Sequence, residues 1–123
     1  MSDIDLPSLF ERLGGVEGIT AIANDVVERH KVHPVIAPRF LDVDDAKLKE
    51  LVRDFFITGS GGPECYTGRD MEETHTGMNL NEAEFLAALD DCLAAVDGQE
   101  VDAITRNEVM GIFYSFKDAV LHR

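Results

Sequence analysis

Residues 61–80 read GGPECYTGRDMEETHTGMNL, and this stretch decides which fold the chain can adopt. Glycine and proline crowd the segment from Thr58 to Asp70, which predicts a long structured loop without regular secondary structure. A loop of that length is uncommon in a compact domain and often serves a function. His75 follows it on a short helical turn before Asn79, a piece too small to be explained by packing alone. His75 is therefore the candidate functional residue.

The rest of the chain predicts helices. Apolar residues recur with the period of an α-helix nearly throughout, and no segment alternates as a strand would. A polar residue followed three positions later by glutamate marks a capping box at Ser8 and again at Asn81. The expected helices begin near Ser8, Gly18, Asp44, Asn81 and Asp102, and the last runs as far as Val120. At this length we expect an all-α fold in a single domain, residues 1–123.

The helix that follows the cap candidates Asp44 and Asp45 has the clearest pattern. Its apolar residues fall at i, i+3, i+4, i+7 and i+8, which places them on one face. They are Leu48, Leu51, Val52, Phe55 and Phe56.

Composition excludes several classes of protein. The net charge of −13 argues against a nucleic-acid partner, because phosphates require a basic surface. No apolar run reaches the ~20 residues of a membrane span, and the amino terminus lacks the features of a signal peptide. Cys65 and Cys92 match no metal or redox spacing, which favours unpaired thiols in a reducing compartment. We therefore expect a cytoplasmic protein, as a monomer or a weak dimer.

A lone histidine permits two interpretations. Most such residues lie on the surface or form hydrogen bonds in a core, and a single imidazole makes a poor zinc site. It is sufficient for haem, because the porphyrin supplies four nitrogens and the protein needs only one axial ligand. Haem also requires apolar walls, and Phe40, Phe55 and Phe56 could provide them.

The sequence resembles the group I truncated haemoglobins over nearly its whole length. The shared features are the Gly14–Gly15 pair, PRF ending at Phe40, FF at 55–56 and, above all, residues 61–80. The resemblance implies a shortened globin fold, with helices packed two over two around haem b and His75 as the proximal iron ligand. It implies haem contacts from Phe40, Leu48, Val52, Phe55, Phe56, Tyr66, Arg69, Met71, Leu80 and Phe85. Arg69 could pair with a propionate, or could be a solvent-exposed loop cation.

The chain departs from this family on the opposite, distal side of the haem. The family usually places a tyrosine and a glutamine there as hydrogen-bond donors to bound oxygen. The corresponding positions here are Val27, Leu48 and Val52, none of which can donate. Leu51 occupies the position from which some relatives supply a sixth iron ligand. The resemblance thus implies an apolar distal pocket around a penta-coordinate iron.

His30 leaves a second question open. It lies three residues beyond Val27, so it could either approach the distal side or remain partly exposed near the helix end, which is the expectation we favour. For function, reversible binding of O2, CO or NO leads. The alternatives are a redox enzyme (nitric-oxide dioxygenase, nitrite reductase or peroxidase-like), which would need a reductase as partner, and a gas sensor.

Overall fold

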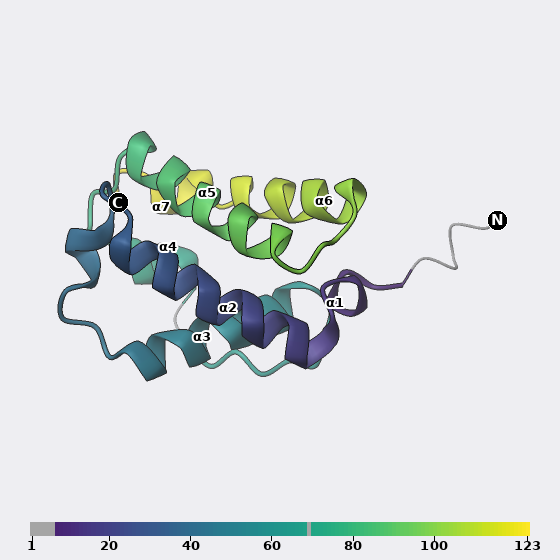
Figure 1. Ribbon diagram of the computed structural model, residues 1–123. Helices are drawn as coiled ribbons and strands as arrows, with labels where there is room; N and C mark the ends of the chain where they lie inside the picture. The colour runs from purple at the N-terminus through teal and green to yellow at the C-terminus, as the bar shows by residue number, and fades with distance from the viewer. Residues whose placement is uncertain (1–6, 69) are drawn as a thin grey trace.

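The computed structural model describes residues 7–68 and 70–123, which form helices and the segments that connect them (Figure 1). These are α1 (Leu9–Arg12), α2 (Gly15–Val32), the 3-10 helix η2 (Ala37–Phe40), α3 (Asp45–Gly59), α4 (Met71–His75), α5 (Glu82–Asp97), α6 (Ala103–Tyr114) and α7 (Lys117–Val120). Across these two ranges the only β-type pairing is an isolated bridge between Leu80 and Leu121. The expectation of an all-α fold is confirmed.

The long helices form two layers. α2 packs against α3 and against α5, and α5 packs against α6. Figure 1 shows the pair α5 and α6 lying along one side of the pair α2 and α3. This is the two-over-two sandwich that the sequence predicted.

Most helix starts lie where local sequence signals placed them. The Ser8 hydroxyl accepts a hydrogen bond from the Glu11 backbone N–H at 3.1 Å. A carboxylate oxygen of Asp44 likewise accepts from the Lys47 N–H at 3.1 Å, which caps α3. The cap of α5 at Asn81 follows the same pattern. Such caps satisfy backbone donors that the first turn of a helix leaves without partners.

Two boundaries differ from the sequence-based expectation. α2 begins at Gly15 rather than near Gly18, because Gly14 has φ of 95°, a conformation that lets the chain turn sharply out of α1. The last expected helix is broken in two. At Ser115 and Phe116 the backbone bonds shift to the i→i−3 pattern, and the Ser115 hydroxyl donates to the carbonyl of Ile112.

The core fills only part of the space between the layers. A cluster of buried residues lies toward the α1 end, formed by Leu9, Leu13, Ile19, Ile22, Val26, Ile57, Cys92, Ala95, Val96 and Val109. In α3, by contrast, only Ile57 is buried, and the apolar face that the sequence predicted is half-buried. If this apolar face of α3 packed fully against other side chains, its residues would be buried. Because they are only half-buried, the face borders a cavity.

In the ranges 7–68 and 70–123, no helix combines the length and apolar character needed to cross a lipid bilayer.

Candidate functional site

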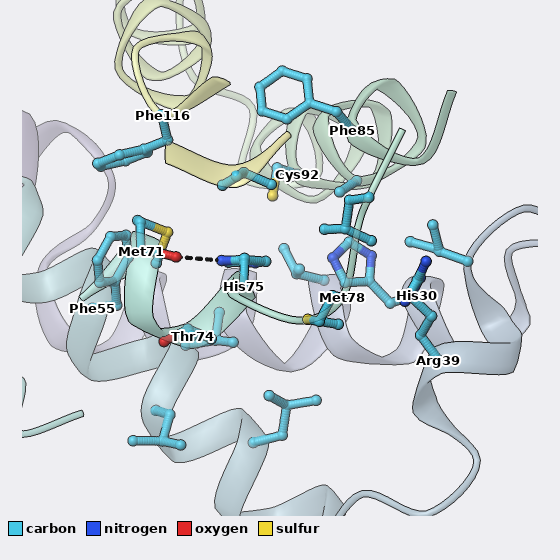
Figure 2. Close-up of a pocket in the computed structure, with 18 of the residues that line it drawn as sticks. His30, Arg39, Phe55, Met71, Thr74, His75, Met78, Phe85, Cys92 and Phe116 are labelled. Carbon is cyan, nitrogen blue, oxygen red and sulfur yellow. Dashed lines mark hydrogen bonds between the residues drawn. The ribbon is translucent and has the colours of Figure 1, made fainter. Parts of the chain in front are cut away.

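A cavity of about 460 Å³ lies between the layers. This volume is within the range of about 300–1,000 Å³ common for small-molecule and cofactor sites. Its wall consists mainly of aliphatic and aromatic side chains from α2, η2, α3, α5 and α6, together with α4, which carries His75. Figure 2 shows His75 between Met71 and Phe55 on one side and His30 and Arg39 on the other.

Nearly all the residues that the resemblance assigned to haem contact line this cavity. They are Phe40, Leu48, Val52, Phe55, Phe56, Tyr66, Met71, Leu80 and Phe85, together with His75. Arg69 lies outside the described residues. The structure therefore brings together side chains from η2, α3, α4 and α5 and from the loops that hold Tyr66 and Leu80.

Val26 and Val27 of α2 are both buried, and one of them lines the cavity. Val27 is fully buried, but it is not among the residues lining the cavity; that part of the wall comes from Val26. Successive residues of a helix point about 100° apart, so Val26 and His30, four residues apart, face the cavity together. The wall is apolar at Val26, and the distal role of Val27 stays a prediction.

His75 is held in a defined orientation. Its Nδ1 lies 2.7 Å from the carbonyl oxygen of Met71, four residues earlier on α4 (Figure 2). A carbonyl can only accept, so Nδ1 carries the proton and donates it in this bond. The other ring nitrogen, Nε2, is then left with a lone pair. Metal-binding histidines commonly use this arrangement, in which the outer hydrogen bond fixes the tautomer and the ring.

α4 is short and is held at both ends. At its start, a carboxylate oxygen of Asp70 accepts from the Glu73 N–H at 2.7 Å, and the two residues form a capping box. Beyond its end, the Gly77 and Asn79 N–H groups donate to the carbonyl of Arg123 at 3.1 and 3.0 Å. The helix that presents His75 thus depends on a cap and on the last residues of the chain, rather than on its own length.

The glycine-rich loop is attached to the end of α3. The Thr58 hydroxyl oxygen accepts hydrogen bonds from the backbone N–H groups of Cys65 and Tyr66, at 3.0 and 3.1 Å. The ring of Tyr66 then packs edge-on against Phe55, with ring centres 5.2 Å apart. The loop therefore forms part of the cavity wall through Tyr66, and its contact with haem stays a prediction.

His30 lies near the end of α2 and keeps some exposure, as we favoured, but it also lines the cavity. Its side chain is only 13% exposed and lines the cavity, and its ring centre lies 5.4 Å from that of Phe40. Its Nδ1 lies 2.7 Å from a carboxylate oxygen of Asp91, which is itself buried in α5. Burial lowers the pKa of His30, and the hydrogen bond to Asp91 opposes this only in part.

A second polar pair, Arg39 and Glu84, joins η2 to α5 at the cavity wall. The guanidinium donates to both carboxylate oxygens of Glu84, and one of these bonds, from Nη2 to Oε1, measures 3.2 Å. The hydrogen bond from Arg39 lowers the pKa of Glu84. Glu84 also closes the capping box of α5. Both charges are therefore compensated.

Three residues of the site were not predicted from the sequence as site residues: Phe113 and Phe116, which line the cavity, and Asp91, which is hydrogen-bonded to His30. Phe113 and Phe116 belong to the apolar face of the last expected helix, so their periodicity could have suggested a role in the wall. Asp91 was detectable only as an acidic residue among inward-facing positions of its helix. Within the described part of the chain, no group of three or more histidine, cysteine, aspartate or glutamate side chains could hold a metal ion.

Comparison with known proteins gives a consistent result. A family model for the bacterial-like globins matches residues 8–122. The group 1 truncated hemoglobin of a Nostoc species is 26% identical over 118 residues, which is 96% of this chain and 100% of the relative. That of a Synechocystis species is 32% identical over 95 residues, 74% of this chain and 77% of the relative.

Solved structures share the fold. The truncated hemoglobin of Tetrahymena pyriformis, in its Fe(III) form, aligns with a TM-score of 0.91 and 24% identity, over 95% of this chain and 100% of that one. A 2/2 hemoglobin from a Synechococcus species, solved in the cyanomet state with covalently attached heme, aligns with a TM-score of 0.86 over 95% and 100% of the two chains.

Proposed function

Because the chain belongs to the group I truncated haemoglobins of the bacterial-like globin family, we propose that it holds one haem b and reversibly binds O2, CO or NO. This proposal is supported above all by one observation: the oriented imidazole of His75 and the half-buried apolar face of α3 line the same cavity. When bound, haem supplies an iron with a free coordination position for a diatomic gas. Every other contribution comes from the chain.

The residues of the cavity fit this group chemically. His75 offers a neutral Nε2, the form that an iron ligand requires, because Nδ1 is the protonated nitrogen. The half-buried side chains of Phe40, Phe55 and Phe56 would lose their remaining exposure against a porphyrin. At about 25 cal/mol per Å² of apolar surface removed from water, this burial favours retention of the cofactor.

The distal side supplies no hydrogen-bond donor from α3. Leu48, Leu51 and Val52 line the cavity there, and none of them carries a polar group. Solved forms of the Tetrahymena hemoglobin include variants at a tyrosine and at two glutamines, spaced in sequence as Val27, Leu48 and Val52 are here. This equal spacing supports the inference that the chain has apolar residues where that relative is polar. Oxygen should therefore be released quickly.

The proposal also covers the protein's oligomeric state, its compartment and its redox partner. The net charge of −13 opposes close association of copies, which favours a monomer or a weak dimer. Two free cysteines favour a reducing compartment such as the cytoplasm. Oxygen binding requires ferrous iron, so a reductase is the expected protein partner.

Titration of the apoprotein with haem tests the proposal. We expect a sharp absorbance endpoint at one haem per chain, because the cavity that His75 lines is the one proposed to hold the haem. Reduction and exposure to carbon monoxide should then shift the Soret band. A titration without an endpoint, or with the spectrum of free haem throughout, would contradict the proposal.

Loss of the cap on α4 should weaken haem retention more than it lowers the stability of the folded protein. Asp70→Ala removes an N-cap worth about 1 kcal/mol, so haem transfer to a scavenger protein should accelerate about fivefold. Asp102→Ala is the matched control, since it removes the cap of α6, where Asp102 accepts from the Thr105 N–H at 2.8 Å. It should lower the melting temperature without accelerating haem release. Equal acceleration in both variants would refute a specific role for α4.

A further inference from the structure

His30 lines the cavity and is hydrogen-bonded to the buried Asp91 of α5, although neither residue is needed to hold a haem. The two side chains are 13% and 11% exposed, and their ring nitrogen and carboxylate oxygen are 2.7 Å apart. Placing a carboxylate and an imidazole at largely buried positions costs free energy unless the two groups form a hydrogen bond with each other. The pair therefore indicates a function other than holding the haem.

The hydrogen bond determines which nitrogen of His30 can react. A carboxylate only accepts, so Nδ1 carries the proton of the neutral ring. Nε2 has no partner among the described residues, and none of their side-chain nitrogens is both fully buried and without a partner. Nε2 therefore borders open space, as an unshared lone pair on a ring that lines the cavity.

The other titratable groups of the wall are poorly suited to accept a proton. The carboxylate of Glu84 is bound to Arg39, which lowers its pKa. Burial raises the pKa of Cys92 to about 12, so its thiol keeps its own proton. The imidazole of His75 is committed to Met71 through Nδ1 and, under the proposed function, to iron through Nε2. His30 is kept neutral by burial, and Asp91 stabilises the ring once it is charged.

We propose that His30 and Asp91 form a proton-accepting site that makes the cavity selective for ligands carrying an acidic proton, such as hydrogen cyanide, hydrogen sulfide and hydrogen peroxide. This inference rests on the proposed haem function. The bond between hydrogen and the rest of the ligand breaks, the proton forms a new N–H bond at Nε2, and the conjugate base keeps the electron pair. The pair gains one proton and becomes a neutral imidazolium–carboxylate couple.

The same tautomer gives no advantage to aprotic gases. O2 and CO carry no proton, and an Nε2 with a lone pair cannot donate a hydrogen bond to them. The pair therefore leaves the apolar character of the distal side intact for these gases. Within one pocket, the pair therefore distinguishes ligands that carry an acidic proton from gases that carry none.

Cyanide and azide provide a matched pair of probes for the ferric protein. Hydrogen cyanide keeps its proton in neutral water and must lose it to bind as cyanide, whereas azide is already an anion. His30→Gln and Asp91→Asn should slow cyanide association about tenfold or more, since each removes the base or its charged partner. Azide association, and CO binding to the ferrous form, should change little.

Two exposed residues serve as controls, because Asp90→Asn and His122→Asn change the same residue types at positions that do not line the cavity. Both should behave as the parent protein. Nitrogen-15 NMR of the parent apoprotein gives a readout independent of haem and of any variant's folding, and should find the His30 proton on Nδ1. A proton on Nε2, or unchanged cyanide kinetics in His30→Gln and Asp91→Asn, would overturn the inference. Failure of the parent to bind haem would instead refute the proposed function.

Discussion

Replacing His75 with alanine should abolish tight haem binding. The imidazole is the only nitrogen ligand presented from α4, and its orientation is fixed by the hydrogen bond to the Met71 carbonyl. Loss of an outer hydrogen-bond partner alone typically costs about 10–100-fold in metal affinity, so loss of the ligand should exceed roughly a hundredfold. The rate of haem transfer to a scavenger protein, together with the Soret spectrum, measures this effect.

Two controls separate ligand loss from misfolding. His75 is half-buried and packs in no core cluster, so the His75→Ala apoprotein should keep the parent's helical circular dichroism. Added imidazole should restore a histidine-like spectrum by occupying the vacated position. His122→Asn changes an exposed histidine with a positive φ, which asparagine tolerates, and should retain haem as the parent does. Retention of the parent spectrum by His75→Ala would mean that another residue binds the iron.

Introducing a donor into the apolar distal wall should slow oxygen release. Val52 lines the cavity from α3, and Val52→Gln adds an amide that can donate to a ligand on the iron. A hydrogen bond to a partly charged acceptor contributes about 1.5–3 kcal/mol, and 1.4 kcal/mol corresponds to a factor of ten. Oxygen dissociation should therefore slow roughly ten- to a hundredfold, as measured by stopped-flow mixing with a reductant or with carbon monoxide.

Val52→Met is the matched control for this substitution. Methionine adds a side chain of similar length without a donor, so any steric effect should appear in both variants. Carbon monoxide polarises less than oxygen, and its dissociation should change little in either variant. If methionine slows oxygen release as much as glutamine does, the effect is steric, and the absence of a donor does not explain the behaviour of the parent.

Features set by short-range hydrogen bonds could be predicted from the sequence. The caps at Ser8, Asp44 and Asn81 each involve residues three positions apart, so the sequence contains both partners. The apolar face of α3 was also predictable, because helical periodicity places its residues on one side. The same periodicity could not reveal that this face borders a cavity, since that depends on how the layers pack.

Features set by distant contacts were missed. Asp91 lies 61 positions from His30, so nothing near His30 in sequence signals its carboxylate partner. Which of Val26 and Val27 lines the cavity depends on how α2 is rotated against α3 and α5. The local sequence pattern does not determine that rotation. The break at Ser115 was missed for a different reason, because its hydroxyl bonds the carbonyl of Ile112 in the same helix, and apolar periodicity does not report such a local bond.

The absorption spectrum of the reduced, ligand-free protein bearing one haem tests the central claim most directly, because it reports how many protein ligands the iron has. With His75 as the axial ligand and only apolar side chains among the described α3 residues that line the cavity, we predict a five-coordinate, high-spin spectrum. A six-coordinate, low-spin spectrum would contradict it, since a second side chain would then occupy the position proposed for the gas.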